Sequence, residues 1–181
     1  MLATFLDRVV AARRGRAVVV RGEPGIGKSF LLAALGAHAR AAGIAVHVIN
    51  LLDFGQDASE RPTPALAARF LGLPVAAAAE ERESAIARAV SAGWLSPRDA
   101  YAAADLLGLP PSPDAVSVLS AMNDTVRERA RARLLHSLLE RVAAERPQLI
   151  VVEDAHWADA VEVGYLGDLA ASASPLPVLL A

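Results

Sequence analysis

The segment Gly22–Ser29 contains the residue types that can hold a phosphate group. It reads Gly-Glu-Pro-Gly-Ile-Gly-Lys-Ser, a complete match to the pattern G-x-x-x-x-G-K-[ST] of a P-loop. Its glycines permit backbone angles that other residues resist, so successive amide groups can point inward at an anion. Lys28 offers a mobile positive charge to the β- and γ-phosphates, and the hydroxyl of Ser29 is a ligand for Mg²⁺. The segment therefore predicts a site for a nucleoside triphosphate, taken as ATP, with Mg²⁺.

The predicted nucleotide contacts are the loop residues and the one that follows them. They are Gly22, Glu23, Pro24, Gly25, Ile26, Gly27, Lys28, Ser29 and Phe30. Lys28 is also the only lysine of a chain that otherwise uses arginine for its permanent positive charges. A compact ammonium group on a flexible stem suits phosphate oxygens better than a broad guanidinium group does.

Two acidic residues supply the second half of the same site. Glu153 and Asp154 follow the apolar run Leu149–Val152, which is the pattern of a Walker B segment. We assign Glu153 to Mg²⁺ with Ser29, because the ion needs oxygen ligands near the γ-phosphate. Asp154 is assigned to the attacking water, which a carboxylate can orient or deprotonate. With Lys28, these acids are the predicted catalytic residues; because their order is the reverse of the commoner one, a shared or reversed role stays open.

The elements that must position these residues follow from the apolar pattern. Strands are expected at Ala17–Val20, Ala45–Ile49, Leu149–Val152 and Leu176–Ala181. A helix is expected from Lys28 to about Ala42, with Gly43 ending it. Strand, helix and strand at this spacing predict a parallel sheet with helices on its faces. The fold class is therefore α/β, a three-layer P-loop NTPase.

A helical insertion is expected within this fold. Residues 53–146 contain no strand pattern, and Asp53–Thr63 is the expected surface loop. Ser96–Asp99 predicts a helix start, with a serine cap and a proline in the first turn. Thr125 and Glu128 predict a capping box for a long helix whose arginines form a solvated face. Residues 1–181 are thus taken as one domain, truncated after its fourth strand because a strand reaches the last residues.

Composition narrows the class of protein. Hydrophobic residues make up 54% of the chain, but no apolar run approaches the roughly 20 residues of a membrane-spanning helix. The chain has no cysteine, and its net charge of −2 gives no electrostatic reason to bind nucleic acid. We expect a cytoplasmic protein with no membrane partner and no direct nucleic-acid contact.

Two segments carry a resemblance to a known family. Arg21–Ser29 and Val151–Asp159 resemble the corresponding segments of AAA-like STAND ATPases of bacterial multidomain regulators. That group includes ATPase modules next to adenylate or guanylate cyclase domains and large LuxR-type transcription activators. The resemblance implies a nucleotide-dependent signalling switch with slow ATP hydrolysis, whose partners are other domains of a larger regulator or copies of itself. It also implies that the fourth strand lies between the strands of the P-loop and the Walker B acids.

Three other interpretations compete with a regulatory ATPase. A weak Mg²⁺-dependent ATPase of this group would need a sensor residue and a helical lid beyond Ala181, outside this chain. The first alternative to it is a scaffold that binds nucleotide without hydrolysis. A small-molecule P-loop kinase would need a lid and an acceptor site, and a DNA loader would need a winged helix; neither is evident.

Four residues near the predicted strand ends are given structural roles. His156 and Trp157 are expected to pack the end of the Walker B strand against the next helix, which Asp159 caps. The alternative for His156 is contact with the γ-phosphate. His47, in the second strand, is also expected to be structural.

Overall fold

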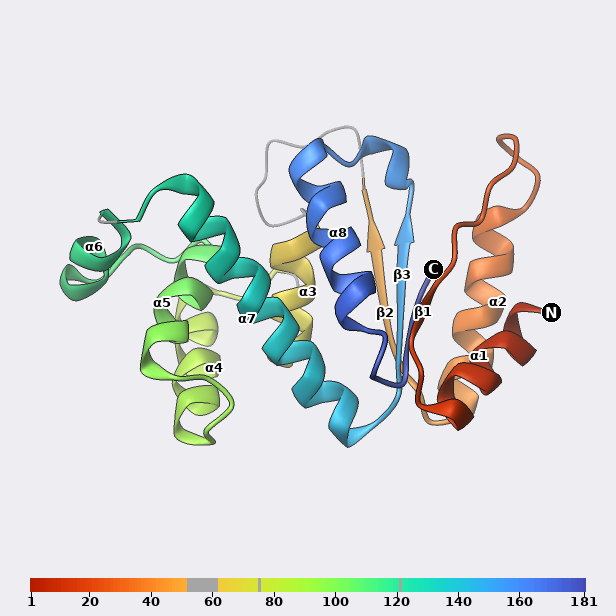
Figure 1. Ribbon diagram of the computed structural model, residues 1–181, viewed down its shortest axis with the longest axis horizontal. Coiled ribbons are helices and arrows are strands. Elements are labelled where there is room, and N and C mark those ends of the chain that lie inside the picture. The colour runs from red at the N-terminus through yellow and green to blue at the C-terminus, as the bar shows by residue number, and fades with distance from the viewer. Residues whose placement is uncertain (52–61, 75, 121) are drawn as a thin grey trace. The chain divides into compact units, whose positions relative to one another are not determined.

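The computed structural model describes residues 1–51, 62–74, 76–120 and 122–181 (Figure 1). These residues divide into two compact units. The first unit contains both ends of the chain, Met1–Asp53 and Val142–Ala181, and the second contains Phe54–Arg141. The assignment of residues 53–146 as an insertion in a single domain stays a prediction. The surface loop expected at Asp53–Thr63 lies mostly outside the described residues.

The first unit is built on a parallel sheet. Its four strands are β1 (Arg16–Ala17), β2 (Ala45–Asn50), β3 (Gln148–Glu153) and β4 (Val178–Leu180). They lie side by side in the order β1-β4-β3-β2, and every neighbouring pair is parallel. This confirms the predicted α/β class and the position of the fourth strand between the strands of the loop and the acids.

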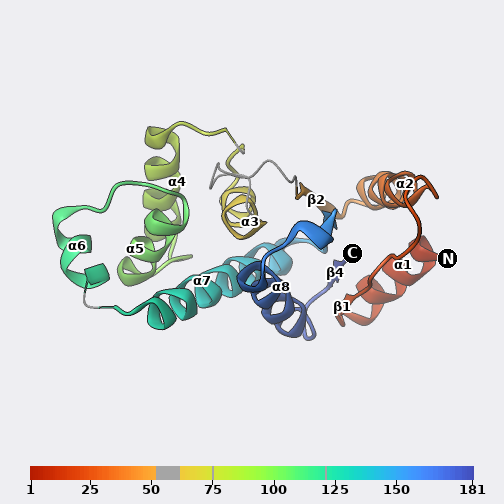
Figure 2. The same ribbon diagram turned by 90° about the horizontal axis from the view of Figure 1, so that it is seen from above.

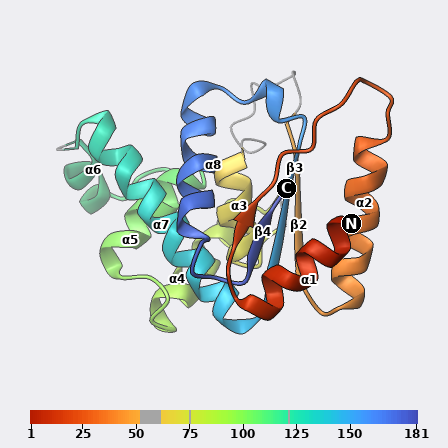
Figure 3. The same ribbon diagram turned by 45° about the vertical axis from the view of Figure 1, so that its right-hand side comes forward.

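Helices cover both faces of this sheet. On one face lie α1 (Leu2–Ala12) and α2 (Lys28–Ala41), and α8 (Ala160–Ser172) lies on the other (Figures 2 and 3). Gly43 follows α2 with a φ of 75°, a left-handed angle that suits glycine at a helix end, as predicted. The first unit therefore has the expected three layers.

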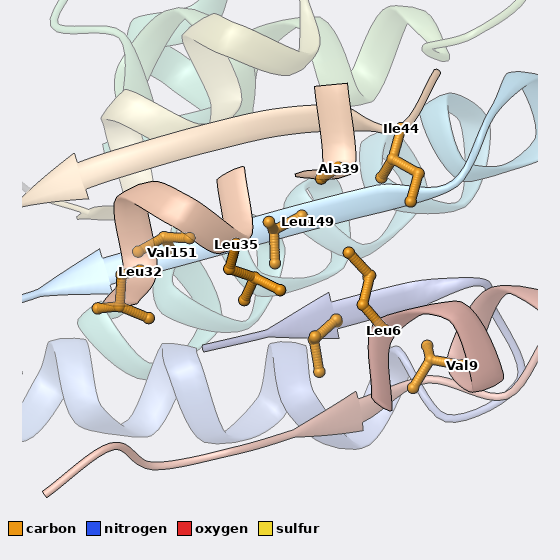
Figure 4. Packing of buried hydrophobic residues seen from close by; sticks show 9 residues of the cluster. Leu6, Val9, Leu32, Leu35, Ala39, Ile44, Leu149 and Val151 are labelled. Carbon is orange, nitrogen blue, oxygen red and sulfur yellow. The ribbon is translucent and has the colours of Figure 1, made fainter. Parts of the chain in front are cut away.

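The core of the first unit lies between the sheet and the α1–α2 layer. Its buried side chains come from four elements and one connection (Figure 4). They are Leu6 and Val9 of α1, Leu32, Leu35 and Ala39 of α2, Ile44 before β2, Leu149 and Val151 of β3, and Leu179 of β4. Alternate residues of β3 face this layer, and Ile150 between them is also fully buried. Burial on both faces is what a continuous apolar run in a parallel sheet predicts.

β1 is shorter than expected. It covers Arg16–Ala17, whereas Ala17–Val20 was predicted to be a strand. The backbone amide of Val18 still donates to the carbonyl of Leu180 at 2.8 Å. β4 itself covers only Val178–Leu180, because Pro177 has no amide hydrogen to donate to a ladder. Beyond β1, Val18 and Val20 are partly buried against the core, whereas Val19 is 77% exposed.

A buried glutamine ties the start of β3 to its surroundings. The side chain of Gln148, 1% exposed, donates from Nε2 to the carbonyl of Val142 at 2.9 Å and to that of Arg146 at 2.6 Å. Its Oε1 lies 2.9 Å from Nε2 of His47 in β2. Gln148 thus binds two carbonyls at the end of the preceding helix. His47 has the structural role that was predicted for it.

The second unit is helical in the part of the chain that the structure describes. It contains α3 (Pro62–Phe70), α4 (Ala79–Ser91), α5 (Pro97–Leu106), α6 (Pro113–Ser120) and most of α7 (Asp124–Glu145). α4 and α5 pack side by side (Figure 2). The predicted start of α5 is confirmed, since the amide of Asp99 donates to Oγ of Ser96 at 3.2 Å.

One expectation about α7 is wrong, and another holds in part. The helix begins at Asp124, and its cap is Asn123, whose Oδ1 accepts from the amide of Val126 at 2.9 Å. The predicted capping box began two residues too late, because asparagine caps as well as threonine does. The predicted solvated face is confirmed for Arg129 and Arg133, which are exposed, but two other arginines have partners within the protein. Arg131 binds Oδ2 of Asp105 through Nε at 3.0 Å and a terminal nitrogen at 2.7 Å, and the guanidinium of Arg141 lies 4.9 Å from the ring centre of Trp94.

A close backbone contact before β1 gives a prediction about stability. A Cβ atom on Gly15 would stand 2.0 Å from the carbonyl oxygen of Ala173. Gly15→Ala must therefore push the backbone segments apart, and we expect it to destabilise the fold by about 1–3 kcal/mol or more. Denaturant unfolding followed by circular dichroism measures this change. Gly164→Ala in α8 is the matched control, because its added Cβ meets nothing within 4 Å; it should stabilise the helix, and equal losses in both variants would contradict the explanation.

Candidate functional site

The glycine-rich loop joins β1 to α2 at the end of the sheet where the parallel strands finish (Figure 1). Gly25 and Gly27 have φ angles of 80° and 98°. An added Cβ at either would meet nothing within 4 Å, so the left-handed backbone, not crowding, requires glycine there. Gly27 caps α2. The amides of the first turn lack helical partners, and the positive end of the helix faces the loop.

Lys28 places its ammonium group on the loop itself. Nζ donates to the carbonyls of Gly22 and Glu23, both at 3.0 Å. An ammonium group has three donors, so this geometry leaves one for another oxygen. The side chain is only half-buried and bonds to its own loop, not to the core. The loop thus holds a positive charge beside its amides, which suits an anion.

The other loop side chains are open to solvent. Ser29, in the first turn of α2, is exposed, and so are Ile26 and Phe30. Phe30 is 81% exposed, a large apolar ring with little protein around it. A Cβ on Gly22 would lie 2.9 Å from Cγ2 of Ile26, so this glycine makes room for the side chain four residues on.

The two acids follow the strand as predicted. Glu153 is the last residue of β3 and stands opposite Asn50 of β2. Asp154 comes next and is exposed, with φ 55° and ψ 36°. This left-handed backbone, which aspartate tolerates better than most residues, ends the strand and turns the chain. Since β1 and β3 run in the same direction in one sheet, the loop and the acids lie at the same edge.

The residues after the acids differ in part from expectation. Asp159 caps α8, accepting from the amide of Glu162 at 2.8 Å, as predicted. His156 and Trp157 form a 3-10 turn in which, contrary to the expected packing role, neither side chain is buried. Both side chains are exposed, because the turn at Asp154 carries them beyond the sheet. Their rings contact each other instead, with centroids 4.9 Å apart.

Oxygen donors suited to Mg²⁺ are present at this edge. The hydroxyl of Ser29 and the carboxylate of Glu153 are hard ligands of the kind the ion prefers. Within the described ranges, no three histidine, cysteine or acidic side chains gather into a group that could hold a metal. Mg²⁺ commonly takes one or two protein ligands and completes its shell with water and substrate phosphates, so this donor set fits the ion.

These features define a P-loop nucleotide-binding module. A strand leads into a glycine-rich loop that caps a helix, and a second strand of the same parallel sheet, two positions along, ends in acidic residues. The whole chain, residues 1–181, matches the AAA ATPase domain family, and the chain belongs to it. It is 29% identical over 185 residues to an uncharacterized protein from Rhizobium meliloti (strain 1021). The match covers 94% of this chain and only 16% of that relative. No solved structure matches the chain.

Membership in this family agrees with the predicted α/β P-loop module and with ATP and Mg²⁺ as the expected ligands of such domains. In the described part of the chain, no helix has the length and apolar character needed to cross a membrane.

Proposed function

We propose that this chain is the ATP-binding module of a larger regulator and works as a nucleotide-dependent switch with slow hydrolysis. The observation that carries the proposal is the loop at the start of α2. There, left-handed glycines, free first-turn amides and the Lys28 ammonium meet, with Nζ 3.0 Å from two loop carbonyls. Such a concentration of donors and positive charge is suited to a polyphosphate chain.

Each residue near the loop has a role in this proposal. The amides of Gly22–Ser29 bind the phosphates, and Lys28 contacts the β- and γ-phosphates. Ser29 and Glu153 would hold Mg²⁺, which when bound would neutralise negative charge on the phosphates. Phe30, 81% exposed beside the loop, offers an apolar surface to the rest of the nucleotide.

Hydrolysis in this proposal depends on Asp154. Its exposed carboxylate orients a water molecule toward the γ-phosphorus. The water oxygen forms a bond to phosphorus while the bond to the β–γ bridging oxygen breaks. The electron pair leaves with ADP, and the proton of the water passes to the carboxylate and then to solvent. The chain's part is mainly positioning, because phosphoryl transfer needs little covalent chemistry from the protein.

The regulatory part of the proposal rests on two supports. One is the resemblance of the loop and the acid-containing segment to STAND ATPases of multidomain regulators. The other is length, since this chain corresponds to 16% of the relative from Rhizobium meliloti (strain 1021). Nucleotide-dependent contacts with other domains, or with further copies of the module, would then carry the signal.

Titration calorimetry with the full chain tests the proposal. We expect saturable binding of ATP in the presence of Mg²⁺, with one site for each chain. No saturable binding up to about 1 mM ATP, the upper end of common substrate ranges, would overturn it. A phosphate-release assay on the same sample separates a switch that hydrolyses ATP from a scaffold that only binds it.

Ser29→Ala should weaken Mg·ATP binding by roughly tenfold while leaving metal-free ATP binding nearly unchanged. The reason is that the hydroxyl contacts the ion and not the phosphates, and one polar contact to a charged group contributes about 1.5 kcal/mol. Titrations with Mg²⁺ and with EDTA measure the two affinities. Ser29→Thr is the matched control because it keeps the hydroxyl. If alanine weakens both forms equally, the hydroxyl shapes the loop and does not bind the ion.

A further inference from the structure

The turn after β3 exposes two aromatic side chains. His156 is 67% exposed and Trp157 is 49% exposed, in a chain in which aromatic residues make up only 4%. Their rings lie 4.9 Å apart at an angle of 38°. A tryptophan usually finds burial or a partner, so an exposed ring pair at this position requires a reason.

This turn is held in place at both ends. The amide of Trp157 donates to the carbonyl of Asp154 at 2.9 Å, and the amide of Ala158 donates to that of Ala155 at 3.3 Å. On the far side, the cap of α8 at Asp159 anchors the chain again. The left-handed backbone of Asp154 directs this braced segment out past the end of the sheet. His156 is therefore an exposed side chain on a fixed backbone.

The two ring nitrogens of His156 have different surroundings. Nδ1 lies 4.0 Å from Oδ1 of Asp154, which is too far for a hydrogen bond. Nδ1 is nevertheless the ring nitrogen that faces this carboxylate. Nε2 has no hydrogen-bond partner among the described residues. Nε2 is thus available to a ligand.

We infer that His156 donates a hydrogen bond from Nε2 to the terminal phosphate of the bound nucleotide, so that the site distinguishes a triphosphate from a diphosphate. This inference rests on the proposed function. The turn lies at the same end of the sheet as the loop that binds the phosphates (Figures 1 and 3). Asp154, proposed to orient the attacking water, is two residues away. The ring donates from Nε2 in its neutral Nε2–H tautomer and when doubly protonated. Trp157 supports the ring from one side.

Calorimetric titration with Mg·ATP and Mg·ADP tests this role. His156→Ala should lower the affinity for Mg·ATP roughly tenfold, the effect of one hydrogen bond to a charged group, and leave that for Mg·ADP unchanged. His156→Gln should retain most of the preference, because its amide group reaches about as far from the backbone as Nε2. His156→Asn should lose it, because its amide reaches only as far as Nδ1.

A matched control is His136→Ala. His136 is also a partly exposed histidine beside an acid, with Nε2 3.2 Å from Glu140, but it lies in α7. Neither affinity should change in this variant. Equal losses for ATP and ADP in His156→Ala, or no loss at all, would overturn the inference while leaving the proposed function intact. Failure of the wild-type chain to bind either nucleotide would overturn both.

Tryptophan fluorescence gives an independent readout. The chain has two tryptophans, so Trp94→Phe leaves Trp157 as the only one. Its emission should differ between the ATP-bound and ADP-bound states, because the terminal phosphate holds the imidazole ring that Trp157 contacts. His156→Ala should remove this difference. Identical emission in both states of the Trp94→Phe chain would count against the inference.

Discussion

Lys28→Ala should lower the affinity for Mg·ATP by roughly 100-fold or more while leaving the fold unchanged. The substitution removes the positive charge beside the phosphates and the hydrogen bond that the remaining ammonium donor can give to a charged phosphate oxygen, and a bond of this kind contributes about 1.5–3 kcal/mol. No other lysine exists in the chain to replace it. Among the described residues, Nζ bonds to the carbonyls of Gly22 and Glu23 in its own loop, so we expect the core to lose no contact. Titration calorimetry beside thermal unfolding by circular dichroism separates the two effects.

Arg40→Ala is the matched control for Lys28→Ala. Arg40 is an exposed cation in the last turn of the same helix, at the end away from the loop. Its removal should leave nucleotide affinity within about twofold, because exposed charges more than a Debye length away, about 8 Å, are largely screened. Unchanged affinity in Lys28→Ala would reject the phosphate-binding assignment of the loop. An equal loss of affinity in both variants would mean that the effect comes from the overall charge of the protein and not from a contact between Lys28 and phosphate.

Local chemistry made much of the fold predictable. The left-handed angles of Gly25 and Gly27 are what the loop pattern requires, and the apolar runs before Glu153 and after Gly43 became β3 and β2. In each case the residues of one short segment are enough to predict the local structure. A buried strand in a parallel sheet needs a continuous apolar run, and a helix start needs a cap within four residues.

The N-terminal helix was not predicted. Leu2, Phe5, Leu6 and Val9 have the spacing of an amphipathic helix, and Leu6 and Val9 are buried in the core. Asp7 also binds His38 of α2 at 2.9 Å. The spacing of these apolar residues is visible in the sequence, and the structure shows that it forms a core helix.

Other differences depend on partners far away in the chain. The strand that pairs with β1 is β4, about 160 residues later in the chain, and the partners of Arg131 and Arg141 are 26 and 47 residues distant at Asp105 and Trp94. Exposure of His156 follows from the backbone at Asp154. Sequence pattern reports local propensity and burial, and it does not report which distant groups meet.

We expect the isolated chain to hydrolyse ATP slowly, below about 1 s⁻¹, the lower end for efficient phosphoryl-transfer enzymes. Charge that develops on the γ-phosphate needs an added cation, and an arginine supplied in cis or by a neighbour contributes about 10³–10⁵ in rate. Arg131 and Arg141 already have partners inside their own unit. Exposed arginines of α7, Arg129 and Arg133, are the remaining candidates on that helix for donation to a neighbouring copy.

Concentration dependence is the measurement that tests this reasoning. A multiple-turnover phosphate-release assay should give a low rate for each chain when the protein is dilute, and a rise with protein concentration would indicate a cation supplied by another copy. Arg129→Ala and Arg133→Ala would then identify the donor. A turnover above about 1 s⁻¹ in dilute solution would contradict the expectation, because water positioning alone leaves most of the electrostatic stabilisation unsupplied.

Asp154→Asn should reduce even this slow rate by about 10²–10⁴, the usual contribution of a positioned general base, without weakening nucleotide binding. Asparagine is the right replacement because it tolerates the left-handed backbone, φ 55°, that Asp154 adopts, whereas alanine would strain the turn that holds His156. Asp168→Asn, which neutralises an exposed acid of α8, is the matched control and should leave the rate unchanged. If Asp154→Asn retains the full rate and Glu153→Gln loses it, the two acids have the reverse of the roles assigned to them, and Glu153 positions the water.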